Sequence, residues 1–430
     1  MTHAVTSRRR FLQLLGGTAL GSALSLGSPF SALAADGDPT DWGWVGPYEK
    51  VSDKSVAWLK DKGWWPLTIG FQSPWTGHNA INIAVDRLGL LAKRGVEQKL
   101  QGFLSGPELI EAFTAGRIQV GATGNFPYHS LVDRRVPVKG VLNYPLLTHA
   151  VIVPNDSPLQ SLADLRGGKE PAVIGLVTGS SSEFYFQAAA QVNGLRIGTD
   201  VVLKNMPLSE QIQLPKGVAA VVPWDHTASL ITQERKTGRA IDTSHPYNLY
   251  EGVGFVRQEL IDNVPDVVQA LTDAYLEAVL WVRRHPDQAV RFLKEDPALK
   301  AIPEDFLAGQ VAQNVLLFKP TFLVPNPELW AAESERIRAW LKERKRLSRD
   351  ISNAEYAGTY APDFIRNSVT RLGWAIPSQP IYFPKDWPGK IGQLPYPPYF
   401  NQSTGATAQP FPVAGDLVKP WSFGGKVYNP

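Results

Sequence analysis

Hydroxyl side chains gather where a predicted strand gives way to a predicted helix. The stretch VTGSSSEFYF runs from an apolar strand end at Val177 through Thr178, Gly179 and three serines into a helical pattern. At such a junction, free backbone N–H groups and the positive end of the helix dipole favour an anion or another polar ligand. Serine and threonine are also preferred helix caps. Taken alone, the stretch favours a cap, and its place in the fold decides whether it also binds a ligand.

Histidine placement is the second feature that could do chemistry. Five of the seven histidines lie in or beside loops that follow predicted strands: His78, His129, His149, His226 and His245. An imidazole can donate a hydrogen bond to an anion without help from arginine. The alternative is a metal or metal chelate held by several of them, although the chain has no HxH or HxxxH pair. At least two are expected to be ordinary structural histidines.

Several other chemistries are excluded by composition and motifs. The chain has no cysteine, which excludes disulfides, cysteine nucleophiles, thiolate metal sites and a lipid-modified cysteine. It has no G-x-S-x-G or H-E-x-x-H motif. With 19% charged residues and a net charge of +3, no basic cluster indicates a nucleic-acid partner. We therefore expect no enzyme activity, no cofactor, no metal and no nucleic acid.

The N-terminus predicts an export signal. The stretch SRRRFL, Ser7 to Leu12, resembles the twin-arginine export motif, and no charged residue follows until after Ala35. The small-residue pattern Ala32-Leu33-Ala34 predicts cleavage near Ala34/Ala35. The mature protein is expected to be periplasmic and without a membrane tether.

The chain then alternates strand and helix patterns, which favours an α/β fold with mostly parallel sheets. After the stretch HAVIVPNDSPLQSLADLRG the strand and helix patterns restart, and a long amphipathic helix from Pro265 returns to the first unit. Its predicted apolar face consists of Val267, Val268, Leu271, Tyr275, Ala278, Val279 and Val282. A further helix is predicted to begin with Asn326 as its cap and Pro327 at its first position. Beyond residue 351 the chain is rich in proline and aromatic residues, which favours an extended segment over a domain with its own core. The expected divisions are a signal peptide (1–35), a lead-in (36–66), lobe 1 (67–148 and 246–351), lobe 2 (149–245) and a C-terminal extension (352–430).

In element order and motif spacing, residues 67–353 resemble the substrate-binding proteins of ABC importers of the nitrate/sulfonate/taurine type. Four stretches carry this resemblance: LSGPELIEAFTAGRIQVGATGNFP, HAVIVPNDSPLQSLADLRG, VTGSSSEFYF and GVAAVVPWDHTASL. Gln119 and Ala219 stand where the family often has aspartate. Those positions usually support structure, so the fold is expected to survive the change.

The resemblance implies a two-lobed type II periplasmic-binding-protein fold with a ligand cleft between the lobes. It implies that loops from both lobes line this cleft. The expected ligand-binding residues are Gln72, Ser73, Trp75, His78, Ser105, Gly106, Thr123, Gly124, Asn125, Thr178, Gly179, Ser180, Ser181, Trp224 and Asp225. A tryptophan directly at the C-terminal end of a strand, such as Trp224, lies where ligands bind in open α/β sheets.

The function implied by the resemblance is capture of a small organic anion, of the sulfonate, taurine or carboxylate type. The protein would deliver it to a permease and its ATPase in the inner membrane, and a monomer is expected. One alternative is a protein that binds nitrate, bicarbonate or a metal chelate. A less favoured alternative is an enzyme of the same fold resembling pyrimidine-precursor synthase, which would need a cysteine-rich iron motif that this chain lacks.

Overall fold

The computed structural model describes most of the chain between residues 47 and 372, together with a short C-terminal hairpin. The described residues are 47–73, 76–144, 149–244, 247, 251–297, 299–311, 323–372, 421–423 and 426–428. Trp75 and His245, two residues with an expected role, lie outside this set, and so does the side chain of His78.

The first sheet has five strands in the order β2-β1-β3-β10-β4. β1 (Leu67–Gln72) pairs in parallel with β2 (Gln98–Phe103) and with β3 (Val120–Gly124). β10 (Gly252–Arg257) lies antiparallel between β3 and β4 (Val138–Tyr144). The C-terminal ends of β1, β2, β3 and β4 therefore share one edge of the sheet.

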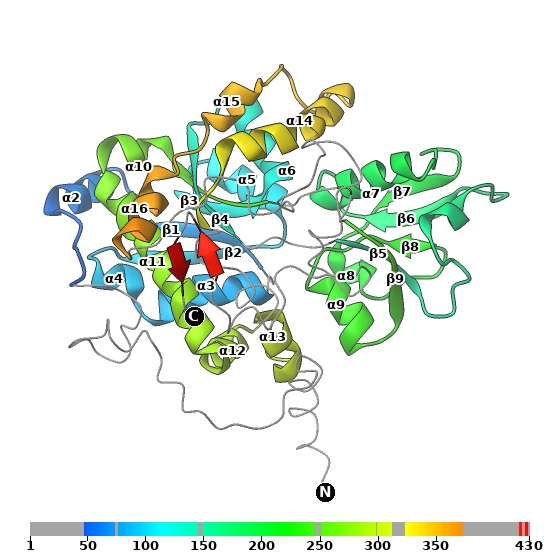
Figure 1. Ribbon diagram of the computed structural model, residues 1–430, viewed down its shortest axis with the longest axis horizontal. Helices are drawn as coiled ribbons and strands as arrows, with labels where there is room; N and C mark the ends of the chain where they lie inside the picture. The colour runs from blue at the N-terminus through cyan, green and yellow to red at the C-terminus, as the bar shows by residue number, and fades with distance from the viewer. Residues whose placement is uncertain are drawn as a thin grey trace, which may run out of the picture.

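The second sheet repeats this plan with the order β7-β6-β8-β5-β9. β6 (Ala172–Leu176) pairs in parallel with β7 (Val201–Asn205) and β8 (Ala220–Val221). β5 (Ala150–Pro154) is antiparallel to β8 and to β9 (Gly238–Thr243). The chain thus leaves the first sheet after β4, builds the second, and returns through β10. This is the two-lobed α/β architecture expected from the sequence (Figure 1).

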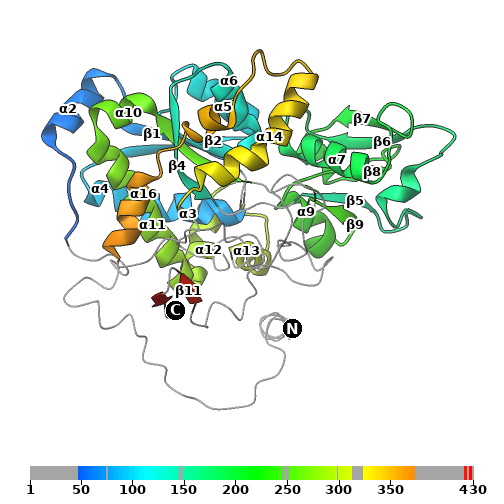
Figure 2. The same cartoon turned by 45° about the horizontal axis from the view of Figure 1, so that its top comes forward.

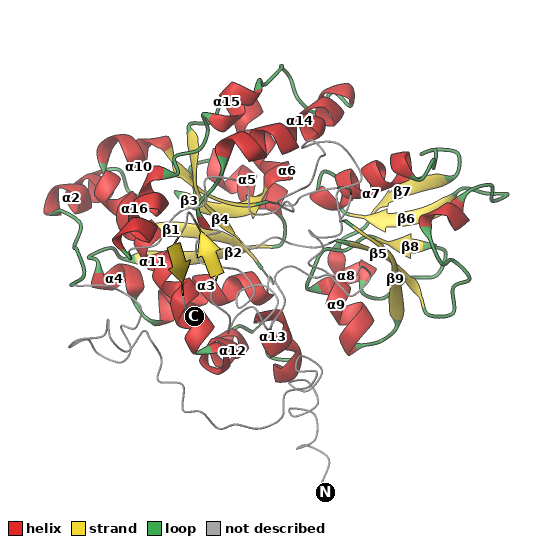
Figure 3. Cartoon of the chain, in the orientation of Figure 1, coloured by secondary structure: helices red, strands yellow, loops and turns green. Residues whose placement is uncertain are grey.

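Helices flank both sheets (Figure 3). Those of the first lobe are α2 (Asp53–Asp61), α3 (Thr76–Arg87), α4 (Leu90–Lys93), α5 (Gly106–Thr114), α6 (Asn125–Asp133), α10 (Gln258–Asn263), α11 (Pro265–Arg284), α12 (Pro286–Glu295), α13 (Glu304–Val311) and α14 (Pro327–Glu343). Those of the second lobe are α7 (Ser181–Val192), α8 (Leu208–Gln211) and α9 (Thr227–Ser229), with short non-α turns at Leu162–Leu165 and Leu230–Glu234. The expected bounds of the two lobes, 67–148 with 246–351 and 149–245, stay a prediction.

The long helix α11 forms the centre of the first lobe. Its predicted apolar face is confirmed, because every member of it is at most 2% exposed: Val267, Val268, Leu271, Tyr275, Ala278, Val279 and Val282. The helix packs against α3 and against α16 (Asp363–Arg371). One of its buried acids, Glu277, forms an ion pair with Arg94 at 2.7 Å. The predicted start of α14 is also confirmed, since the Asn326 side chain accepts a hydrogen bond from the Leu329 N–H.

The first part of the expected C-terminal extension differs from the prediction. Instead of an extended segment, residues 353–371 form α15 (Asn353–Ala357) and α16. Ile365 and Val369 are fully buried in the core of the first lobe, and the Ser368 hydroxyl donates to Asp273 of α11 at 2.6 Å. An apolar pair four residues apart, within an otherwise polar stretch, gave a helical signal that the surrounding prolines obscured. The residues from 373 to 420 lie outside the described set. β11 (Trp421–Phe423) and β12 (Lys426–Tyr428) form an antiparallel hairpin, the last described element.

Within the described ranges, no helix combines the length and the apolar character that crossing a bilayer requires.

Candidate ligand-binding cleft

In the first lobe, polar side chains meet where β1 and β3 end. Gln72, the last residue of β1, is 5% exposed, and its side-chain oxygen lies 3.5 Å from the Thr123 hydroxyl at the end of β3. The Asn79 side chain of α3 donates to the Gln72 carbonyl at 3.1 Å. The structure therefore brings Gln72 and Thr123 together where β1 and β3 end. The second lobe lies beside the first (Figure 2).

Asn125 begins α6 directly after Gly124 and is the least satisfied side chain at this edge. Its backbone is bound, since its N–H donates to the Glu251 carbonyl at 2.8 Å and its carbonyl lies 2.7 Å from His129 Nδ1. Neither polar atom of its fully buried side chain has a hydrogen-bond partner among the described residues. Such a group costs about 1–3 kcal/mol when left unpaired, so a ligand that pairs it gains that energy back.

Ser105 and Gly106 instead serve the local structure at the start of α5. The Ser105 hydroxyl caps the helix by accepting from the Glu108 N–H, and Pro107 follows at the first turn. A Cβ atom on Gly106 would lie 2.4 Å from the Thr123 hydroxyl and 2.8 Å from a Pro127 side-chain carbon. Glycine therefore lets α5 begin in close contact with the end of β3.

Ser73 is only partly exposed, and its N–H donates to the Phe103 carbonyl at 2.8 Å.

In the second lobe, the VTGSSS stretch forms the turn between β6 and α7. Ser180 is the N-cap, because its hydroxyl accepts from the Ser182 N–H at 3.2 Å and donates to the Val177 carbonyl at 2.6 Å. Gly179 adopts a φ of +79°, which glycine tolerates best, and its N–H donates to Glu183 at 2.7 Å. Thr178 is exposed, and its N–H donates to Asn205 at 3.0 Å. The cap predicted as one alternative is therefore present at Ser180.

Ser181, the first residue of α7, has a different partner. Its hydroxyl lies 2.8 Å from His149 Nε2, and both side chains are buried. Burial lowers the pKa of His149 to about 3, so this imidazole is neutral at pH 7. The pair joins the start of α7 to the start of β5, on the edge where β6 and β8 end.

Trp224 and Asp225 follow β8 at the same edge. Trp224 pairs through its backbone with His149, is 6% exposed, and its indole N–H has no partner among the described residues. The Asp225 carboxylate accepts from the Ser229 N–H at 3.0 Å and lies 3.5 Å from the Gln310 amide of α13. Burial raises the pKa of Asp225. The contact between Asp225 and Gln310 joins the second lobe to a helix of the first.

The histidines do not form one group. Burial lowers the pKa of His129 to about 3 and that of His226 to about 4, so both are neutral at pH 7. His129 stacks on Tyr356 of α15 at 4.7 Å between ring centroids, which makes it a core residue rather than a cleft residue. His226 is buried as well, and it follows Trp224 by two residues in the sequence. Among the described residues, no three histidine or acidic side chains come close enough together to hold a metal ion.

Sequence reasoning missed Glu251, which lies at the start of the return strand β10. It is fully buried, and Tyr360 donates to its carboxyl group at 2.8 Å. Burial raises the pKa of the Glu251 carboxyl group well above the usual value. The backbone carbonyl of Glu251 accepts from the Asn125 N–H, so this residue supports the start of α6. A single acid directly before the apolar run GVGFV was the available signal.

Comparisons with known proteins agree with this fold. The family model described as NMT1-like family matches residues 64–292, more than half of the chain. A protein of Escherichia coli (strain K12), provisionally named as an aliphatic sulfonates-binding protein, is 25% identical over 230 residues, which are 49% of this chain and 66% of that relative.

Two solved structures illustrate the shared fold. The alkanesulfonate-binding protein of Xanthomonas axonopodis pv. citri bound to MOPS has a TM-score of 0.57 and 18% identity, covering 69% of this chain and 97% of its own. The periplasmic nitrate-binding protein of Synechocystis PCC 6803 has a TM-score of 0.57 and 14% identity, covering 73% of this chain and 91% of its own. At these identities the likeness establishes the type II periplasmic-binding fold.

Proposed function

We propose that this chain, which belongs to the NMT1-like family, is the extracytoplasmic substrate-binding protein of an ABC importer. In this proposal it captures one small organic anion between its lobes, performs no turnover, and delivers the anion to a membrane permease with its ATPase. Export by the twin-arginine route with cleavage near Ala34/Ala35, a periplasmic location and a monomeric state belong to the same proposal.

One observation carries the proposal: at the strand ends of each lobe lies a buried polar side chain that has no hydrogen-bond partner in the part of the chain that the structure describes. These are Asn125 in the first lobe and Trp224 in the second. An indole N–H can only donate a hydrogen bond, so its partner has to be an acceptor. A sulfonate or carboxylate head supplies several acceptor oxygens, and the indole ring supplies an apolar wall for the ligand's body.

The groups described at this edge favour an organic anion over a bare inorganic ion. Hydroxyl, amide and indole groups of Ser181, Asn125 and Trp224 are neutral donors. The neighbouring histidine, His149, is neutral as well. Neutral donors attract a small, strongly hydrated ion less than a guanidinium group does. An organic anion also gains apolar burial, which offsets the weaker attraction of its charge.

Calorimetry of the mature protein against taurine, ethanesulfonate, benzoate, nitrate and bicarbonate tests the function. We expect one-to-one binding of an organic anion with a dissociation constant on the order of micromolar or tighter. Tighter binding of nitrate or bicarbonate than of the organic anions would show that the ligand is an inorganic anion. Steady consumption of a substrate without stable binding would contradict the binding-protein proposal and favour an enzyme.

A further inference from the structure

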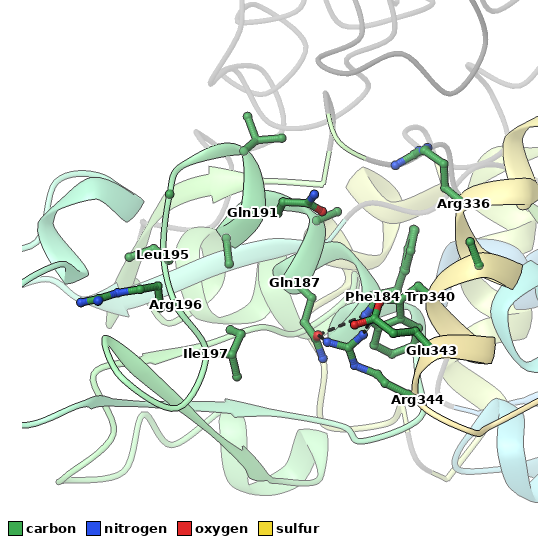
Figure 4. A pocket seen from close by; sticks show the side chains of 15 residues that line it. Phe184, Gln187, Gln191, Leu195, Arg196, Ile197, Arg336, Trp340, Glu343 and Arg344 are labelled. Carbon is green, nitrogen blue, oxygen red and sulfur yellow. Dashed lines mark hydrogen bonds and ion pairs between the residues drawn. The ribbon is translucent and has the colours of Figure 1, made fainter.

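A second hollow lies between α7 of the second lobe and α14 of the first, apart from the strand ends described above (Figure 4). Its volume is about 960 Å³, at the upper end of the range for small-molecule pockets. None of the expected cleft residues lines it. We call this hollow the α7–α14 groove.

The walls of the α7–α14 groove are aromatic and aliphatic. Phe184 of α7 and Trp340 of α14 meet edge to face, with ring centroids 5.7 Å apart. Ala188 and Ala339 lie on the facing helices and leave space between them. At the rim, Val192 and Ile197 are 46% and 41% exposed, values that few large apolar side chains of the described chain reach. Because Val192 and Ile197 are exposed to water, covering them is favourable.

The charges of the groove are mainly positive. Three arginines line it, against one glutamate: Arg196, Arg336, Arg344 and Glu343. The Arg344 guanidinium lies 4.6 Å from the centre of the Trp340 ring and also donates to Gln187 of α7. Glu343 lies 3.5 Å from Arg344 and is 76% exposed, so water screens this pair strongly. Arg196 is 70% exposed and pairs with Asp200 at 3.0 Å, and Arg336 pairs with Glu333 at 2.9 Å. Arg344 is therefore the guanidinium group that an anion in the groove would meet.

We propose that the α7–α14 groove is a second binding site, which takes a flat aromatic anion stacked against Trp340 with its charge on Arg344. Its two walls come from different lobes, and α7 also carries Ser180 and Ser181 at the cleft. A ligand that contacts both walls favours the arrangement of the lobes that holds them together. By linkage, occupation of the groove and of the cleft then alter one another's affinity.

The test uses 2-naphthoate as the probe and Trp224→Ala protein as the background, because that substitution weakens binding at the cleft. Calorimetry on this background is expected to show one binding event. Adding Arg344→Gln is expected to weaken it at least about tenfold, because a charged hydrogen-bond partner is lost. Adding Lys342→Gln, on the same helix but not lining the groove, is the matched control and is expected to leave affinity unchanged.

A second variant is needed because Arg344→Gln also removes the hydrogen bond from Arg344 to Gln187. Ala339→Trp fills the groove without removing a hydrogen bond and is expected to abolish binding of 2-naphthoate, with the melting temperature confirming a folded protein. No binding on the Trp224→Ala background up to millimolar 2-naphthoate would overturn the proposal. So would equal affinity in the Arg344→Gln and Lys342→Gln proteins. Neither outcome bears on the cleft, whose ligands are tested in protein with Trp224 intact.

Discussion

At the scale of single residues, the site is distinguished by which polar atoms already have partners. The hydroxyl groups of Ser180 and Ser105 cap helices. Asn125 and Trp224 keep polar atoms without a partner among the described residues. Residue type alone could not separate these two groups, because a serine at the start of a helix can either cap the helix or bind a ligand. Only the geometry shows which hydrogen-bond partner each hydroxyl group has.

Replacing Asn125 with alanine is expected to change the free energy of unfolding by less than about 1 kcal/mol, since the unpaired amide is lost along with its packing. The matched control is Asn82→Ala on α3. The Asn82 side-chain oxygen accepts from Tyr275 at 2.8 Å and lies 3.3 Å from the Tyr144 hydroxyl. Its removal is expected to cost about 1–3 kcal/mol. Urea unfolding of both proteins checks this, and equal losses would show that Asn125 is a structural amide.

The buried His129 is expected to make stability depend on pH. Its pKa is about 3 in the folded protein and about 6.5 when unfolded, so the unfolded chain binds the extra proton. The stability that neutral His129 contributes is present above about pH 6.5 and is lost as the pH falls towards 3. Each pH unit in that window costs about 1.4 kcal/mol.

A comparison of wild type with His129→Gln isolates this effect, because other buried groups titrate alike in both proteins. We expect the variant to be less stable at pH 7.5 and the gap to narrow by about 2 kcal/mol at pH 5.0. Urea titrations at the two pH values measure the gap. A gap that stays constant would contradict this, because it would mean that the pKa of His129 is the same in the folded and the unfolded chain.

At the scale of elements, the sequence predicts what depends on neighbouring residues and misses what depends on distant ones. The apolar face of α11 and the Asn326 cap of α14 follow from spacing and are confirmed. The insertion of β10 between β3 and β4 involves strands more than a hundred residues apart, and no local pattern encodes it. For the same reason the cross-lobe contact of Asp225 with Gln310 could not be predicted.

The start of α7 gives an element-scale prediction. Ser180→Ala removes its cap and is expected to lower stability by about 1 kcal/mol while ligand affinity stays within about twofold. Ser52→Ala removes the equivalent cap of α2, where the Ser52 hydroxyl accepts from the Ser55 N–H at 3.2 Å, and is the matched control. Melting temperature and calorimetry on both proteins check this. A large loss of affinity for Ser180→Ala alone would assign its hydroxyl to the ligand.

At the scale of the whole molecule, the two lobes touch through aromatic and charged groups as well as through the chain crossings. Phe184 of α7 lies 6.0 Å from Phe126 of α6, measured between ring centroids. Glu183 pairs with Arg346 at 3.0 Å, beyond the end of α14. These contacts hold the start of α7 opposite the first lobe, so a ligand at the strand ends can be reached from both sides.

The central claim is that one anion is held by both lobes at once, and a calorimetric titration of variants from each lobe tests it most directly. The tightest-binding anion of the panel above is titrated into wild type, Asn125→Ala and Trp224→Ala, with Asn82→Ala as the folded control. We predict one-to-one binding in wild type, a loss of about tenfold or more in each cleft variant, and near wild-type affinity in the control. Unchanged affinity in either cleft variant would contradict the claim, because the ligand would then be held by one lobe or at another place.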